Sequence, residues 1–262
     1  MQLFRKILGT TFLHPLFRKL HKVSLWGMNY GMASYYGDNG EIYALKKILK
    51  NNPSLEWAHF DVGANQGTYT RAVLPLLADR PFQLHAFEPS GDSFRKLSEA
   101  ITITNQIYLW NLGLSDSTGN RELHSDTQGS TLSSIYKRDL NHINKHFNRV
   151  ETISVETLDD FCDRNKIPKI DFLKLDVEGH ELSVLTGASK MLKNNNIRYI
   201  QFEFGGGNID SRTYFKDFFL LLSPQYKIYR ILKNGLFEIT SYSERLEVFQ
   251  SANYLASLRD SK

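Results

Sequence analysis

Hydrophobic positions along the chain fall into short apolar runs, separated by segments in which apolar residues recur at helical spacing. The apolar runs predict strands at 56–62, 82–88, 107–114, 150–155, 170–176 and 197–204. The segments between them predict helices at 40–52, 68–78, 90–105, 158–165, 179–193 and from Asp210 through Leu222. Because strands and helices alternate, we expect an α/β fold with a mostly parallel sheet covered by helices on both faces.

The last part of the pattern predicts antiparallel strands. Two β-rich runs within 226–242 flank Asn234-Gly235, a dipeptide strongly preferred in two-residue hairpin turns. Thr157 and Asp210 are the expected N-caps of the helices that follow them. The polar segment 115–149 is hard to assign to helix or strand. Within it, residues 126–138 could line an acceptor pocket or form a surface loop.

The turn FDVGANQGTYT, residues 60–70, joins the first predicted strand to a helix. Ligands of such sheets bind at the carboxyl ends of the strands, where this turn lies. Gly63 and Gly67 allow the backbone to approach a ligand closely, and the helix N-terminus favours an anionic group. Asp61 would suit an ammonium group, so the turn suits the amino acid portion of a ligand. Its G-x-x-x-G spacing differs from the dinucleotide fingerprint and from the phosphate-binding loop.

Glu88 supplies a second piece of the candidate site. It ends the second predicted strand, where an acidic residue can accept hydrogen bonds from both ribose hydroxyls. An amino acid and a ribose together indicate S-adenosylmethionine as the cofactor.

Several segments, in order, resemble the FkbM-type S-adenosylmethionine-dependent methyltransferases. They are FDVGANQGTYT, AFEPS, NLGLSD, TLDDF, IDFLKLDVEGHELSVLTGA and IQFEF. The resemblance implies a class I methyltransferase (Rossmann-like) sheet with a C-terminal antiparallel hairpin. It also implies O-methylation of a sugar or natural-product hydroxyl, so the expected partner is a small-molecule or glycan acceptor.

The resemblance further implies roles for individual residues of this chain. The methionine end of the cofactor would be held by Asp61, Gly63, Asn65 and Gly67, and the ribose by Glu88. Asn111 and Leu112 would border the adenine.

A hydroxyl acceptor must be aligned with the methyl group and must lose its proton, which a nearby base assists. Asp176 ends the fourth core strand, His180 follows it closely, and Glu203 ends the next strand. We expect these three residues and Glu178 to face the crevice, and we take Asp176, His180 and Glu203 as the catalytic candidates. They could also ligate a divalent ion, but no further ligand spacing supports this, and no metal is expected. Glu178 and Glu181 fit equally well as favourable charges in the first turn of a helix.

Two other functions remain open from the sequence. An NAD-type oxidoreductase would explain Glu88 equally well but lacks the G-x-G-x-x-G fingerprint. Its Tyr-x-x-x-Lys pair, Tyr229 and Lys233, falls in the predicted hairpin, where such residues are about 13 Å apart. A non-catalytic binding module that kept the fold is the other alternative.

Charge divides the chain into two parts. Of its 32 Lys and Arg residues, five precede Asp38, whereas none of the 28 Asp and Glu residues does. We therefore separate a basic, apolar N-terminal arm, residues 1–37, from a single methyltransferase domain, residues 38–262. The near-neutral domain argues against a nucleic-acid partner. The arm could bind an anionic membrane surface peripherally or pack on the domain as a helix.

The cysteine content and the hydropathy of the chain indicate the cellular compartment to expect. Cys162, the single cysteine, excludes an internal disulfide and a multi-cysteine zinc site. No apolar run reaches the length of a transmembrane helix. A cytoplasmic protein is expected, with the inner face of the membrane as the place where the arm would act.

Overall fold

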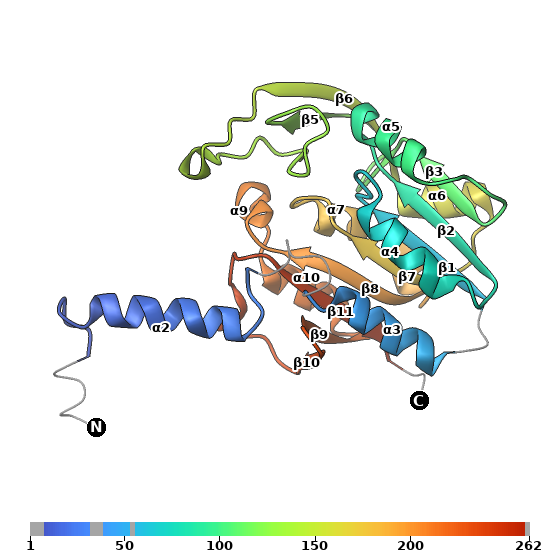
Figure 1. Cartoon of the computed structure of the whole chain (residues 1–262). Coiled ribbons are helices and arrows are strands. Elements are labelled where there is room, and N and C mark those ends of the chain that lie inside the picture. Colours follow the sequence, from blue (N-terminus) through green and yellow to red (C-terminus); the bar gives the residue numbers. More distant parts are fainter. Residues whose placement is uncertain (1–7, 32–38, 53–55, 260–262) are drawn as a thin grey trace.

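The computed structural model describes residues 8–31, 39–52 and 56–259, and among these a sheet of eight strands forms the centre of the fold (Figure 1). The strand order is β10-β9-β11-β8-β7-β1-β2-β3. The strands are β1 (Trp57–Val62), β2 (Phe82–Phe87), β3 (Ile107–Trp110), β7 (Ile170–Leu175), β8 (Ile197–Phe204), β9 (Tyr226–Leu232), β10 (Gly235–Ile239) and β11 (Ala252–Leu258). Neighbours from β3 to β8 pair in parallel, and the remaining pairs are antiparallel. The expected α/β class and mostly parallel sheet are confirmed.

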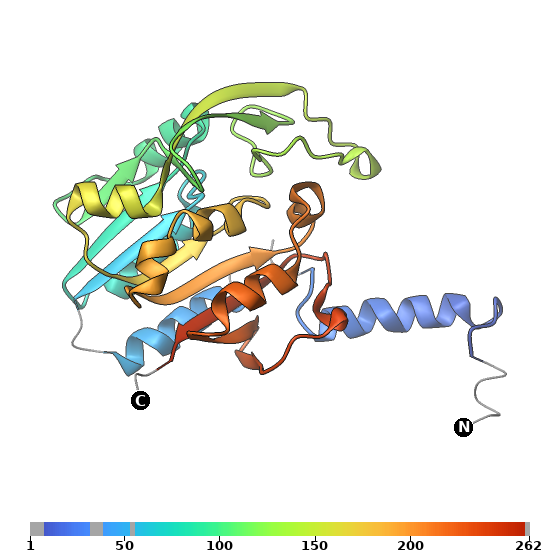
Figure 2. The same ribbon diagram turned by 180° about the vertical axis from the view of Figure 1, so that it is seen from behind.

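Helices cover both faces of this sheet (Figures 1 and 2). One face carries α3 (Glu41–Asn51), α4 (Thr68–Leu77) and α5 (Gly91–Ala100), whose apolar residues share one buried cluster. The other face carries α6 (Leu158–Asn165), α7 (Glu181–Thr186), α8 (Ser189–Lys193) and α10 (Phe215–Leu222), in a second cluster. Apolar side chains on both sides of the strands explain why the core strands are continuous hydrophobic runs.

A smaller sheet lies over the carboxyl ends of the core strands (Figure 1). It contains β4 (Gly113–Ser115), β5 (Gly119–Ser125) and β6 (Arg149–Thr157) in the order β4-β6-β5. The predicted strand 107–114 is therefore split into β3 and β4. In the segment 115–149, which the sequence leaves unassigned, β5 pairs with β6 although most residues of β5 are polar. Leu123 of β5 contributes to a small apolar cluster, too weak a pattern to mark a strand.

The predicted hairpin is confirmed, but its two turn residues are Lys233 and Asn234, since Gly235 already lies in β10 and pairs with Leu232 of β9. The chain then continues into β11, which the sequence pattern did not predict. This strand inserts between β8 and β9, so the hairpin is separated from the parallel strands by one antiparallel strand.

Two helix predictions needed correction. The predicted helix 179–193 is interrupted after Thr186, because Gly187 packs so closely on Ser115 that a side chain would meet its backbone carbonyl. Asp210 is not the N-cap of a helix through Leu222: it lies within α9 (Gly207–Ser211), and α10 begins later. The Thr157 cap is confirmed, since its hydroxyl accepts from the backbone N–H of Asp160 over 3.0 Å.

The N-terminal arm contains α2 (His14–Gly27), which projects from the body (Figures 1 and 2). Of the residues in α2, only Leu25 is buried. The alternative in which this helix packs along the domain is therefore contradicted. The part of the arm at 1–7 and 32–38 lies outside the described residues. None of the helices in the described ranges combines the length and apolar character needed to cross a bilayer.

Candidate active site

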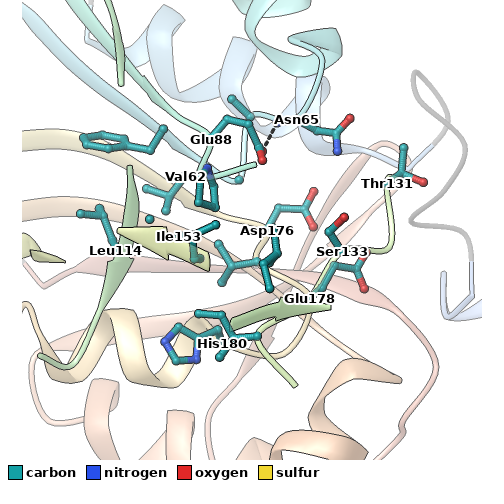
Figure 3. A pocket seen from close by; sticks show the side chains of 18 of the residues that line it. Val62, Asn65, Glu88, Leu114, Thr131, Ser133, Ile153, Asp176, Glu178 and His180 are labelled. Atoms are coloured by element: carbon teal, nitrogen blue, oxygen red, sulfur yellow. Dashed lines mark hydrogen bonds between the residues drawn. The ribbon is translucent and has the colours of Figure 1, made fainter. Parts of the chain in front are cut away.

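A cavity of about 420 Å³ lies at the carboxyl ends of the core strands (Figure 3). Its walls come from the turn after β1, from Glu88 and Pro89 after β2, from residues 112–114, and from the segment 131–135 beneath the small sheet. The turn 176–180 after β7 and Glu203 of β8 close the remaining side. The cavity thus occupies the region where the parallel strands predicted a ligand.

The turn after β1 is shaped by its two glycines. Gly63 has a φ of +84°, and its N–H donates to the carbonyl of Phe87 over 3.0 Å. A side chain on Gly63 would meet the backbone carbonyl of Asp176, so close packing of two strand ends requires this glycine. Gly67 has a φ of +80° and precedes α4, and an added Cβ there would lie 2.7 Å from Leu97 Cδ1. The sequence predicts that these glycines let a ligand approach the backbone closely. The structure shows that close packing within the protein requires them as well, which sequence reasoning missed.

Asp61 lies beneath the turn and is completely buried. Its carboxylate accepts a 2.6 Å hydrogen bond from the Thr70 hydroxyl, and its other oxygen lies 3.6 Å from Nζ of Lys174. Burial raises the pKa of Asp61, and the charge of Lys174 opposes that shift. The carboxylate thus has a cationic partner within the protein, and its expected contact with a ligand ammonium remains a prediction.

Glu88 faces the cavity and is 5% exposed. One carboxylate oxygen accepts from the backbone N–H of Asn65 over 2.8 Å, the contact drawn in Figure 3. The other accepts from the backbone N–H of Ser90 over 2.9 Å. Burial raises the pKa of Glu88 to about 7, although both hydrogen bonds act in the opposite direction. The structure therefore presents a fixed acceptor group to the cavity.

Asn65 and Asn111 organise the backbone around Glu88. Asn65 has a φ of +48° and donates from its side-chain amide to the carbonyl of Ser130 over 3.0 Å. Asn111 is exposed and donates to the backbone carbonyls of Glu88 and Pro89, over 2.9 and 3.0 Å. Asn65 lines the cavity, whereas Asn111 is not among the lining residues, so its expected place beside the adenine is not supported by the cavity.

The wall beside Glu88 is apolar. Leu112 lines it as expected, together with Phe87, Leu114, Leu123 and Ile153. Such side chains suit a flat heteroaromatic ring, because they remove its faces from water without demanding hydrogen bonds.

Three carboxylates meet at the other end of the cavity. Asp176, Glu178 and Glu203 each place one oxygen so that these oxygens lie within 4.8 Å of one another. Figure 3 shows Asp176 beside Glu178. The structure thus brings together two of the expected catalytic residues. Glu178, also expected in the crevice, lies with them; it has a φ of +53° and lies outside α7, in the turn that faces the cavity. The sequence left a helix-terminus charge and a place in the crevice equally open for Glu178, and the structure places it in the cavity wall.

Each of these carboxylates already has a partner. Nζ of the buried Lys174 lies 3.1 Å from Asp176, between it and Asp61. Glu178 forms an ion pair with Arg138. Burial raises the pKa of Glu203 well above its usual range, with Asp176 adding to the shift and a hydrogen bond with Ser251 opposing it. Burial and Asp176 likewise raise the pKa of Glu178, against the effect of Arg138.

Oxygen ligands of this kind suit Mg²⁺ or Ca²⁺, but the same groups suit the uptake of a proton. The expected alternative ion set included His180, and the structure places Glu178 there in its stead. The expectation that no metal binds here therefore stays a prediction.

His180 lines the cavity but has hydroxyl partners at both ring nitrogens. Nε2 lies 2.9 Å from Oγ of Ser115, and Nδ1 lies 3.0 Å from Oη of Tyr136. Burial lowers the pKa of His180 to about 4, so the ring is neutral near pH 7. This arrangement favours a role in positioning the 176–180 turn over direct removal of a proton from an acceptor.

Part of the polar segment 126–138 lines the cavity, and its contact with an acceptor stays a prediction. Thr131 and Ser133 contribute hydroxyl groups, and Leu132 and Ile135 contribute apolar surface. Its last residue, Arg138, is buried and pairs with Glu178 and, at 3.5 Å, with Asp210 of α9. Arg138 thus links the segment between β5 and β6 to the 176–180 turn and to α9. No local sequence pattern predicted these contacts.

Comparison with known proteins places this geometry in context. The family model described as "Methyltransferase FkbM domain" matches residues 61–235. Hexuronic acid methyltransferase AglP of Haloferax volcanii is 27% identical over 147 residues, which are 56% of each chain. The match therefore spans about half the length of this curated relative.

Solved structures show more distant similarity. The FkbM methyltransferase of Methylobacillus flagellatus KT aligns with a TM-score of 0.44 and 16% identity, over 76% of this chain and 43% of that one. The N-terminal domain of human METTL16 in complex with SAH aligns with a TM-score of 0.45 and 11% identity, over 84% of this chain and 69% of that one.

Proposed function

Because the chain belongs to the FkbM methyltransferase family, we propose that it transfers a methyl group from S-adenosylmethionine to a hydroxyl group of a sugar or a related natural product. One observation carries the proposal most directly. A single cavity has the buried acceptor Glu88 at one end and the carboxylates Asp176, Glu178 and Glu203 at the other. The first suits a ribose, and the second suits a hydroxyl that must lose its proton.

The residues on the Glu88 side fit the cofactor. Glu88 would accept hydrogen bonds from the ribose hydroxyls, since each carboxylate oxygen has capacity beyond its present bond. The backbone from Gly63 to Asn65 would border the methionine portion, and Leu112 the adenine. When bound, the cofactor supplies a methyl group already activated by its sulfonium.

On the acceptor side, Asp176 is the proposed base. Its carboxylate is half-buried in the cavity wall and is held by the Lys174 ammonium at 3.1 Å. It would orient the acceptor hydroxyl and take up its proton as the oxygen forms its new bond to carbon. Glu203, which lies in the same group of carboxylates, is the second candidate.

A sugar acceptor has support from two directions. The relative from Haloferax volcanii is described as a hexuronic acid methyltransferase. The cavity also offers the hydroxyls of Thr131 and Ser133, close in sequence to each other and suited to a polyhydroxylated ligand. We propose that the reaction takes place in the cytoplasm, with peripheral contact to the inner face of the membrane, for which α2 is argued below.

The test is a methyl-transfer assay with labelled S-adenosylmethionine and a glycan panel that includes neutral and uronic sugars. We expect one product class with the mass of an added methyl group, made by the wild-type protein and greatly reduced for Asp176→Asn. Absence of transfer to every hydroxyl acceptor, with reduction of NAD by a glycan alcohol instead, would favour the oxidoreductase alternative.

A further inference from the structure

The helix α2 carries large apolar side chains that the domain does not cover. Leu16 and Leu20 are each 52% exposed and Val23 is 61% exposed. Phe17 and Trp26 are exposed as well, and Phe12, just before the helix, is 89% exposed. A stripe of this size on a projecting helix is typical of a binding surface.

The stripe lies on one side of the helix. Leu16, Leu20 and Val23 recur at spacings of four and three, which places them along one face. Arg18 and Lys22, four residues apart, lie on the opposite side. The helix is therefore amphipathic, with an apolar face and a basic face.

The base of α2 is held firmly by the domain. Tyr30 is 1% exposed, and its hydroxyl accepts from Arg230 of β9 over 2.7 Å. The side-chain amide of Asn29 donates to the carbonyl of Ile231 over 3.0 Å. The N–H of Gly31 donates to the carbonyl of Ser251 over 2.8 Å. The apolar face is thus displayed on a fixed support.

The charge of the N-terminal arm indicates what binds to the apolar face of α2. Residues 1–37 contain Arg5, Lys6, Arg18, Lys19 and Lys22 and no acidic residue. A second copy of α2 offers no acidic residue to complement these charges, so it is a poor electrostatic match for the helix. An anionic bilayer instead attracts the basic side chains while the apolar face enters the boundary between headgroups and acyl chains. Trp26, whose ring lies 4.6 Å from Nζ of Lys22, has the amphipathic character found at this depth.

We propose that α2 is a docking helix for an anionic lipid bilayer. Its apolar face, Leu16, Phe17, Leu20 and Val23, inserts at the headgroup level, and Arg18, Lys19 and Lys22 contact the lipid phosphates. Figures 1 and 2 show α2 projecting from the same side of the body as the connection between β5 and β6, which helps to form the cavity. Docking would therefore hold the protein at the surface with this side toward lipid-borne material. Membrane binding itself does not depend on the proposed methyl transfer.

The experiment is co-sedimentation of the full-length protein with vesicles of phosphatidylcholine containing phosphatidylglycerol. We expect strong binding at low salt, loss of most binding near about 0.5 M salt, and little binding to pure phosphatidylcholine. Leu16→Glu with Leu20→Glu should abolish binding. Arg18→Gln, Lys19→Gln and Lys22→Gln together should weaken it about a hundredfold, since each basic residue contributes about fivefold.

Matched controls are available on the body. Lys46, Lys47 and Lys50 are exposed on α3, so their triple change to Gln alters the net charge equally and should leave vesicle binding nearly unchanged. Ile103→Glu places a new charge at another exposed apolar position. If the wild-type protein ignores the anionic vesicles at low salt, or if the two triple variants lose binding equally, the proposal is wrong. A dimer in sedimentation equilibrium that Leu16→Glu with Leu20→Glu dissociates, without vesicle binding by the wild type, would assign this face to a second copy.

Discussion

The backbone N–H of Asn65 donates to the carboxylate of Glu88 over 2.8 Å, so the turn after β1 and the end of β2 meet at one acceptor group. The second oxygen of that carboxylate is fixed by the N–H of Ser90. Glu88 is therefore held in one orientation before any ligand arrives, which lowers the entropic cost of binding a ribose.

Cofactor affinity should depend on pH through Glu88. Burial raises the pKa of Glu88 to about 7. In the free protein, Glu88 is therefore mostly a carboxylate at pH 8 and mostly a neutral acid at pH 6. Only the carboxylate form accepts hydrogen bonds from both ribose hydroxyls. A neutral Glu88 must therefore lose its proton before the ribose can bind in this way. We expect affinity for S-adenosylhomocysteine to fall by roughly tenfold from pH 8 to pH 6. Calorimetry at a series of pH values measures this, and Glu88→Gln should remove the dependence. The same pH profile in that variant would assign the effect to another group.

Asp176→Asn should separate chemistry from binding. Asparagine keeps the shape of the side chain and its place in the cavity but cannot take up a proton. We expect turnover to fall by about 10²–10⁴, the usual contribution of a general base, while affinity for S-adenosylhomocysteine changes little. Single-turnover methyl transfer together with calorimetry measures both.

The neighbouring candidates provide the comparison for that variant. If Glu203→Gln lowers turnover as much as Asp176→Asn does, the proton is shared between the two carboxylates. His180→Gln should have a smaller effect, because both ring nitrogens of His180 already have hydroxyl partners. Normal turnover by Asp176→Asn beside an inactive His180→Gln would make His180 the base.

Gly63→Ala should destabilise the fold before it affects any ligand. The substituted residue would have to keep a φ of +84° and would meet the backbone carbonyl of Asp176. We expect the free energy of unfolding to fall by at least about 2 kcal/mol. Gly235→Ala is the matched control, since an added Cβ meets nothing within 4 Å there, and it should change stability by less than about 0.5 kcal/mol. Denaturant unfolding of both variants checks this, and equal stabilities would show that the turn relaxes freely.

Sequence patterns predicted the parallel core and much of the site because those features are local. The core strands are buried on both faces, so each is a short apolar run, and the parallel arrangement brings their ends together. That is why Glu88, Asp176 and Glu203 could be assigned to one crevice before any coordinates. The hairpin was also visible locally, because Asn-Gly between two β-rich runs is typical of a short hairpin connection.

What escaped prediction depends on contacts between distant parts of the chain. Lys174 lies in an otherwise apolar strand. Its ion-pair partners, the carboxylates of Asp61 and Asp176, come close to it only in the folded sheet. Arg138 reaches Glu178 across 40 residues. β11 has a mixed sequence and becomes a strand because β8 and β9 pair with it on either side. A local sequence pattern does not show which distant residues will become neighbours in the fold.

Calorimetric titration of S-adenosylhomocysteine into the wild-type protein and into Glu88→Ala, at pH 8, tests the central claim most directly. Glu88→Ala removes hydrogen bonds to a charged group, which are each worth about 1.5–3 kcal/mol. We therefore predict saturable binding to the wild type and binding tenfold to about a hundredfold weaker in the variant, with circular dichroism confirming that the variant is folded. NAD should give no comparable heat with either protein. Absence of binding to the wild type, or equal affinity in a folded Glu88→Ala variant, would contradict the assignment of this cavity to S-adenosylmethionine.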